Sequence, residues 1–266
     1  MTAFFSRMAA IIERQWVLTA GSWPRLVDLF YWPVVQITIW GFIQLHVFSA
    51  LEGPGAIVLG AVLGAVLLWD VTWRSQLGLT LAYFEEIWSR NLGNLLVSPL
   101  RPIELIAGLM TVSLMKTAIA MVPAVLLAAF AFDFNVFQLG APLALFVLNL
   151  VVFGWSLSLA AAGLVTRFGQ GAQDMPWAIM FGLTPFCAVY YPVEVLPDMI
   201  EPVAMALPPA HIFEGLRALV NENVFAAERL AAAFALNALW LAGGMALYFS
   251  LLSSARERGS LLQIGE

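Results

Sequence analysis

Six long stretches of the chain are apolar over the length that a helix needs to cross a bilayer. That length is about 20 residues, and the stretches are continuously apolar, without the alternation typical of membrane strands. The second stretch contains Asp70 and Arg74, the third contains Lys116, and the other four carry no charged residue. The pattern predicts six transmembrane helices, at about 29–48, 56–80, 105–131, 143–165, 175–193 and 230–254.

The composition also indicates an integral membrane protein. The 266 residues are 62% hydrophobic and 11% charged, whereas soluble proteins average about 45–50% apolar and about 25% charged residues. So few polar side chains cannot cover the surface of a soluble fold. One Cys and two His allow no internal disulfide and give no basis for a Cys/His metal site. We therefore expect no bound metal. Because the chain has no basic run, we also expect no nucleic-acid partner.

The distribution of Lys and Arg around the stretches predicts the orientation, because positive residues gather on the cytoplasmic side of a membrane. If both termini share one side, that side collects eight Arg and the other side two, with the charges inside the stretches left out. Both termini are therefore predicted to be cytoplasmic. The eight are Arg7, Arg14, Arg25, Arg90, Arg101, Arg167, Arg256 and Arg258, and the two are Arg217 and Arg229.

Residues 1–22 are predicted to form an amphipathic helix that lies along the cytoplasmic membrane surface. Such a helix is either a simple anchor or a surface element that touches a cytoplasmic partner. The segment does not resemble a signal peptide, because charged residues interrupt its apolar core. At a helical period, apolar side chains share one face and polar ones the other: Phe4, Phe5, Met8, Ile11, Ile12 and Trp16 against Ser6, Arg7, Glu13 and Arg14.

Residues 85–102 form the longest predicted cytoplasmic connection. The segment mixes charge, a tryptophan and apolar residues, and it ends at Pro99 and Pro102, which stop a helix. We expect a short helix at about 86–96, with apolar positions suited to docking another protein. The residues that we expect to couple to such a partner are Glu85, Glu86, Trp88, Arg90, Asn91 and Asn94.

Residues 190–228 form a proline-rich connection on the external side. Five prolines at this density suit short helices broken by turns, and the apolar residues between them predict re-entrant or interfacial helices. Non-helical backbone at membrane depth needs cover from protein or a water-filled cavity. We therefore expect an external lid or gate, with Pro192, Pro197, Pro209, His211, Glu214 and Arg217 as its candidate residues.

The order of these segments resembles the type 2 permeases of ABC exporters, a family that includes O-antigen, teichoic-acid, drug and lipid export subunits. The resemblance covers essentially the whole chain. It rests on the acidic pair Glu85 and Glu86 before Ser98-Pro99, on the Pro-x-x-x-Leu-Pro step at 192–197, and on the run 207–211 followed by Glu214 and Arg217. The chain departs from the family in having Leu207-Pro208-Pro209 where Asn-Pro is commoner.

The resemblance implies a single permease domain over residues 1–266, in which two copies pair, most simply as a homodimer. Each copy would dock a separate ATP-binding-cassette ATPase, which holds ATP and Mg, through the segment around 86–96. The resemblance further implies a bacterial plasma (inner) membrane location, contact with lipid, and a hydrophobic, amphipathic or lipid-linked cargo. Consistent with this, the sequence has no G-x-x-x-x-G-K-[ST] motif, since its single lysine follows Met115. We expect no enzyme activity and no cofactor in this chain.

The three charges within the stretches have two interpretations each. Charged residues inside a membrane are costly and are functional candidates by default. Asp70 and Arg74 lie four residues apart with the acid first, which suits an ion pair within one helix, and we favour a packing role over a place in the transport path. Lys116 could pair with Asp70, extend to the cytoplasmic surface, or line the path.

Two other classes of protein fit the sequence less well than a permease. An intramembrane serine protease needs a Ser and a His within the bundle, but Ser156 has no histidine in a later span. A proton- or sodium-coupled secondary transporter is the stronger alternative, with Asp70 as its titratable group. However, Arg74 would keep Asp70 ionised, and the sequence shows no internal repeat. Such a carrier would work without an ATPase partner.

Overall fold

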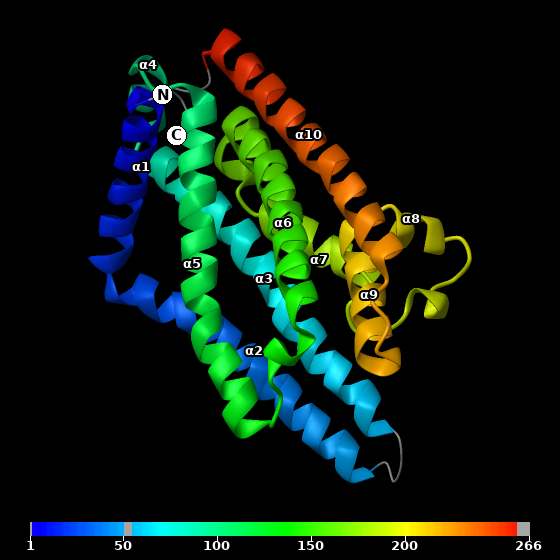
Figure 1. The fold of residues 1–266 in the computed structure, drawn as a ribbon. Helices are drawn as coiled ribbons and strands as arrows, with labels where there is room; N and C mark the ends of the chain where they lie inside the picture. Colours follow the sequence, from blue (N-terminus) through cyan, green and yellow to red (C-terminus); the bar gives the residue numbers. More distant parts are fainter. Residues whose placement is uncertain (1, 51–54, 260–266) are drawn as a thin grey trace.

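The computed structural model describes residues 2–50 and 55–259, and every regular element in these ranges is helical. This agrees with the predicted all-α fold. Six helices are long (Figure 1): α1 (Thr2–Ala20), α2 (Trp23–Ala50), α3 (Gly55–Trp88), α5 (Pro102–Ala131), α6 (Ala141–Phe168) and α10 (Ala227–Glu257). Four α-helices are short: α4 (Leu92–Val97), α7 (Met175–Leu183), α8 (Glu201–Met205) and α9 (Pro208–Glu222). The 3-10 turns are η1 (Val136–Leu139), η2 (Gly169–Ala172), η3 (Thr184–Phe186) and η4 (Val193–Val195).

Four segments in the described ranges are long and apolar enough to cross a membrane: Trp23–His46, Pro102–Ala131, Ala141–Ala172 and Ala227–Glu257. They coincide with the first, third, fourth and sixth predicted stretches. The second stretch lies within α3, which is continuous over 34 residues and is therefore about 51 Å long at 1.5 Å per residue. Its charged residues, Asp70, Arg74, Glu85 and Glu86, therefore lie on one continuous helix with the apolar residues of the second stretch.

The fifth predicted stretch is not one continuous helix, and this expectation is corrected. Helix α7 has nine residues and is followed by the 3-10 turn η3. Pro185 has no N–H to donate to the preceding turn, so the α-helical pattern cannot continue past it. Ala188 then adopts a φ of 52°, a left-handed conformation that turns the chain. Hydropathy alone did not reveal this break.

Helix α6 packs between α3 and α10, and small residues permit the close approach. A side-chain carbon at Gly154 would lie 2.2 Å from Ser75 Oγ on α3, and one at Gly244 of α10 would lie 2.6 Å from the carbonyl oxygen of Ser156. Such contacts are typical of helices that pack within membranes. The α3–α6 contact also contains a hydrogen bond of 3.0 Å from Thr80 Oγ1 to Ser158 Oγ. These three helices form the closely packed centre of the molecule.

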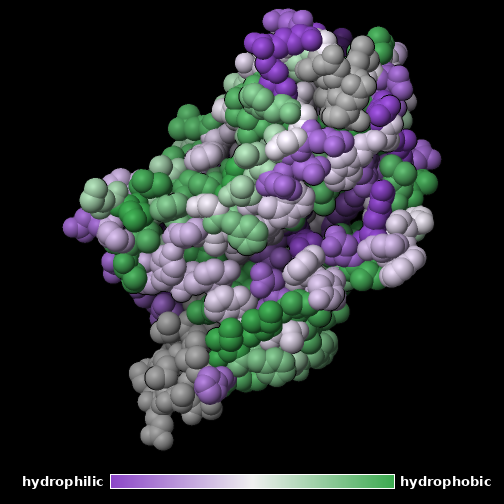
Figure 2. Space-filling view, turned by 180° about the vertical axis from the view of Figure 1, so that it is seen from behind, coloured by the Kyte–Doolittle hydropathy of each residue, from purple (hydrophilic) through white to green (hydrophobic). Residues whose placement is uncertain are grey.

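The first turn of α1, the last turn of α10 and the short helix α4 lie at one end of the molecule, at the top of Figure 1. Hydrophilic residues gather at this end in the space-filling view, whereas a hydrophobic band covers the opposite end (Figure 2). We call the region formed by α1, α4 and residues 82–104 the α4 end. The helices α8 and α9 lie away from it, on another side of the bundle.

Candidate functional site

The segment expected to form one helix at about 86–96 is divided, which corrects that expectation. Helix α3 continues to Trp88, and α4 begins only at Leu92. Between them Arg90 has a φ of 54°, and this left-handed conformation reverses the chain. The turn is held by the Asn91 side chain, whose Nδ2 donates to Glu86 Oε2 at 2.6 Å. Glu85, Glu86 and Trp88 therefore belong to α3, whereas Asn94 belongs to α4.

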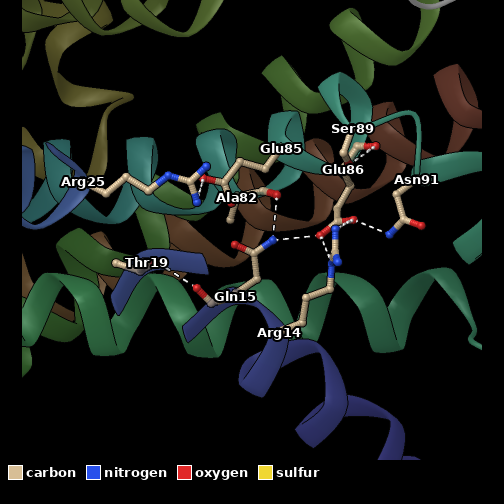
Figure 3. Close-up of polar contacts among 9 residues, drawn as sticks. All are labelled: Arg14, Gln15, Thr19, Arg25, Ala82, Glu85, Glu86, Ser89 and Asn91. Carbon is tan, nitrogen blue, oxygen red and sulfur yellow. Dashed lines mark hydrogen bonds and ion pairs between the residues drawn. The ribbon is translucent and has the colours of Figure 1, made fainter. Parts of the chain in front are cut away.

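Glu86 is fully buried and joins three elements at the α4 end (Figure 3). Arg14 of α1 donates to its carboxylate through Nε at 3.0 Å and through Nη2 at 3.2 Å. Gln15 of α1 donates through Nε2 at 2.9 Å, and Asn91 completes the set. A buried carboxylate is stable only when it is paired and hydrogen-bonded. This network, the Glu86 clamp, fastens α1 to the end of α3 and to the turn before α4.

Two further ion pairs brace the same end. Arg7 of α1 donates to Glu104 of α5 at 2.8 and 2.5 Å, and the Glu104 carboxylate raises the pKa of this guanidinium above its usual value. Glu104 also accepts a 2.9 Å hydrogen bond from the backbone N–H of Arg101. At the start of α2, Arg25 Nη1 lies 3.1 Å from Glu85 Oε1. Helices α1 and α2 are thus both tied to the α3–α4–α5 connection.

Four residues of these networks, Arg7, Arg14, Gln15 and Glu104, were not identified as site residues from the sequence. A signal was present, because Arg7 and Arg14 are seven residues apart and so share one face of a helix. That face meets carboxylates of α3 and α5, those of Glu86 and Glu104. The apolar side chains of α1 contribute to the same contact, since Ile11 is buried near Gly108 of α5.

The predicted coupling residues divide into an inward and an outward group. Glu86 is buried, and Glu85 and Asn91 are half-buried within the pairs just described. Trp88, Arg90 and Asn94 are exposed, and the Trp88 side chain is 51% accessible. Val97 at the end of α4 is 85% exposed. We call these exposed residues, Trp88, Arg90, Asn94 and Val97, the docking face.

The charged residues of the second and third apolar stretches lie around two cavities between α2, α3, α5 and α7. Arg74 Nε lies 3.7 Å from Asp70 Oδ2, one helical turn away on α3. Lys116 on α5 lines the larger cavity, of about 410 Å³, together with Arg25, Glu85 and Arg74. In the described ranges no ion pair within 4 Å joins Lys116 to Asp70. Whether these charges serve packing or transport stays a prediction.

The external candidates lie in a segment of short helices, η4, α8 and α9. Glu214 accepts from the backbone N–H of Val193 at 2.8 Å and pairs with Arg217 at the same distance. Arg217 also donates to the Ala188 carbonyl at 2.9 Å, and His211 Nε2 contacts the Met205 carbonyl at 2.9 Å. These bonds tie α9 to the turns before it. Pro209 lies in the first turn of α9, Pro192 precedes η4, and Pro197 lies between η4 and α8.

The long apolar helices define a multi-pass membrane protein. Comparison with known families identifies its class more closely, because the model of the ABC-2 type transporter family matches residues 7–221. The chain belongs to this family of membrane transport proteins, which agrees with the resemblance found in the sequence. The match begins within α1 and runs through the rest of the α4 end and both cavities to the last turn of α9. A search of curated proteins found no match to the chain.

Proposed function

We propose that the chain is the permease subunit of an ABC exporter, driven by a separate ATP-binding subunit that docks on the α4 end. A hydrophobic, amphipathic or lipid-linked cargo would leave the cytoplasm or inner leaflet through it. The arrangement that carries this proposal is the docking face on the outside of the α4 end with the Glu86 clamp directly behind it. The ABC-2 family membership supports an ATPase partner in general.

The location and assembly form part of the same proposal. The chain would cross the inner membrane of a bacterium six times, with α3 as the second crossing and α7 with its following turns as the fifth. Both termini and the α4 end would be cytoplasmic, as the arginine distribution favours, and α8 and α9 would be external, with the predicted re-entrant position. A second copy, most simply identical, would complete the transporter, and ATP and Mg would bind the partner subunit.

The contacts at the α4 end suggest how force would reach the membrane helices. Movement of the docking face displaces the turn at 89–91, to which Glu86 is hydrogen-bonded through Asn91. Glu86 in turn holds Arg14 and Gln15, so α1 must follow α3. The Arg25–Glu85 pair carries the same displacement to α2. Charge-assisted hydrogen bonds suit this role because they are shorter and stronger than bonds between neutral groups.

The test is a mild-detergent pull-down of the tagged protein from its native membranes, with mass spectrometry and an ATPase assay of the eluate. We expect an ATP-binding subunit in near-equal amount. Trp88→Ala should lower its capture and its coupled ATPase activity without unfolding the bundle. The free energy of unfolding should fall by about 1 kcal/mol, because the ring is half covered and contacts Phe84. Trp23→Ala removes an exposed tryptophan outside the docking face and should leave capture unchanged.

A preparation without any nucleotide-binding partner, even after cross-linking, would contradict the proposal. The alternative would then be ion-gradient transport with Asp70 as the coupling group, because its carboxylate is nearly buried beside a cavity. Equal loss of capture in both tryptophan variants would place the partner elsewhere than on the docking face.

A further inference from the structure

A groove runs between α6 and α10, which lie side by side (Figure 1). Its volume is about 350 Å³, and its wall is almost entirely apolar, with Ala160 on the α6 side and Gly243 and Leu247 on the α10 side. Leu239 and Leu247 in this wall are exposed. Both helices are long and apolar enough to cross a membrane. The groove, which we call the α6–α10 groove, therefore opens outward at membrane depth.

The two adjacent glycines of α10 do different things. A side-chain carbon at Gly244 would lie 2.6 Å from the Ser156 carbonyl oxygen, so this glycine permits the contact between α6 and α10. A side-chain carbon at Gly243 would meet no atom within 4 Å. The helix packing thus does not need Gly243, whose missing side chain instead leaves the α6–α10 groove open.

Two arginines continue the line of the groove toward the α4 end. Arg167 follows Ala160 on α6 by seven residues, and Arg258 follows Leu247 on α10 by eleven. At 3.6 residues per turn, both spacings return to within about 20° of the same helix face. Arg258 lies about 16 Å beyond Leu247 along the axis, at 1.5 Å per residue. This distance is close to half of a hydrocarbon core, which is about 30 Å thick, and so corresponds to one leaflet.

The Arg167 side chain already leans across the groove line. Its Nε donates to Ser254 Oγ of α10 at 3.1 Å, and its guanidinium carbon lies 5.4 Å from the centre of the Phe168 ring. Ser254 follows Leu247 by seven residues and so lies on the same face of α10. These two contacts fix the guanidinium through its Nε and its face. Its two terminal nitrogens form the fork that suits a phosphate oxygen pair.

The carboxylates at this end do not pair with the arginines. Residues 167–174 and 253–259 carry three arginines and two carboxylates, Asp174 and Glu257. Both carboxylates are exposed, and in the described part of the chain neither lies within 4 Å of an arginine nitrogen. Glu257 accepts instead from Ser253 Oγ at 3.4 Å. The third arginine, Arg256, is two residues from Arg258 and so points about 200° away around α10.

We propose that this face binds an anionic glycerophospholipid of the cytoplasmic leaflet. Its phosphate lies on Arg167 and Arg258, and one acyl chain occupies the α6–α10 groove. Basic side chains at the cytoplasmic end of membrane helices attract such head groups. A soluble anion would leave the groove empty, and a helix of another protein would bring no phosphate to the arginines. The site lies outside the cavities along α3, so this lipid is a bound component of the transporter and not its cargo.

The inference uses the cytoplasmic orientation of the α4 end from the proposed function, but it needs no ATPase partner. The experiment titrates the full-length protein, in mild detergent, with dioleoylphosphatidylglycerol and with dioleoylphosphatidylcholine, which carry the same chains and differ in net charge. Native mass spectrometry counts the lipids bound per chain. We expect one phosphatidylglycerol per chain, bound about tenfold more tightly than phosphatidylcholine. An equal concentration of sn-glycerol 3-phosphate should not compete, because it has no acyl chain.

Matched variants separate the head-group contacts from general electrostatics. Arg167→Gln and Arg258→Gln should each weaken phosphatidylglycerol binding about tenfold, the effect of losing one charged hydrogen bond. Arg256→Gln removes the same charge from the same end of α10 but on the other flank. Its affinity should stay within about threefold of the wild type.

A second pair of variants tests the acyl-chain part of the site. Gly243→Leu fills the α6–α10 groove without meeting another atom at its first carbon, so it tests the site even where an arginine variant does not fold. It should weaken phosphatidylglycerol binding about tenfold. Gly182 of α7 is equally unobstructed, and Gly182→Leu should leave binding unchanged.

Four results would each overturn the inference: equal binding of the two lipids, equal losses in Arg256→Gln and Arg258→Gln, displacement by sn-glycerol 3-phosphate, or unchanged lipid binding in Gly243→Leu. A loss of dimer in Gly243→Leu with lipid binding unchanged would also overturn it and assign the groove to a helix of a second copy.

The result is separable from that of the proposed function. Capture of an ATP-binding subunit without a lipid preference would leave the permease assignment intact and reject the lipid site. Phosphatidylglycerol binding that depends on Arg167, Arg258 and Gly243, in a protein without an ATP-binding partner, would support the lipid site and reject the exporter.

Discussion

The Glu86 clamp and the Asp70–Arg74 pair use the same chemistry in opposite ways. Glu86 and Asp70 are both carboxylates of α3 and both are nearly inaccessible. Glu86 is met by Arg14, Gln15 and Asn91 at 3.2 Å or less, whereas Asp70 has its cation at 3.7 Å and an oxygen with no hydrogen bond among the described residues. Glu86 has its hydrogen bonds filled and joins helices, whereas Asp70 keeps an oxygen without a hydrogen bond beside a cavity.

Replacing Glu86 by Gln should have the largest effect on stability. The amide keeps the size of the side chain but removes the charge that Arg14 and Gln15 bind. We expect a loss of about 2 kcal/mol in the free energy of unfolding, the range for hydrogen bonds to charged groups, measured by thermal unfolding in detergent. Arg14→Gln should cost less by itself, and the double variant should show less than the sum, because the residues interact directly.

Replacing Asp70 by Asn should have a smaller effect on stability. The pair with Arg74 exceeds hydrogen-bond distance, and the Asp70 carboxylate is buried, so the cost of removing it from water offsets much of its attraction to Arg74. We expect a loss of about 1 kcal/mol in the same unfolding assay, about half that of Glu86→Gln, because the amide removes one loose ion pair and no short hydrogen bond. Losses of equal size for the two amide substitutions would remove the distinction between the two carboxylates.

The amino-acid pattern predicts the membrane class and most of the helices. A helix that crosses a bilayer needs a long apolar run, and this requirement does not depend on the tertiary contacts. The run 175–193 is predicted as one span because it is continuously apolar, although it contains Pro185, at which the α-helix ends. Pro209 lies in the first turn of α9, where proline loses no hydrogen bond.

The candidate site could be predicted from the sequence less completely than the fold. The acidic pair and Trp88 were located, but both acids were expected to face a partner. Their cations, Arg14 and Arg25, lie 72 and 60 residues earlier in the chain, and a single sequence does not reveal such long-range pairs. The turn at Arg90 was hidden for a different reason: left-handed backbone at an arginine carries no local signal of the kind that Gly or Asn gives.

The docking of an ATP-binding subunit on the α4 end is tested most directly by site-specific photo-cross-linking in native membranes. A photoreactive amino acid replaces Trp88 in one variant and Met199, which is 90% exposed in the external segment, in the other. We predict that position 88 cross-links to a protein with nucleotide-binding motifs and that position 199 does not. Failure of position 88 to capture such a protein, or equal capture from both positions, would contradict the account.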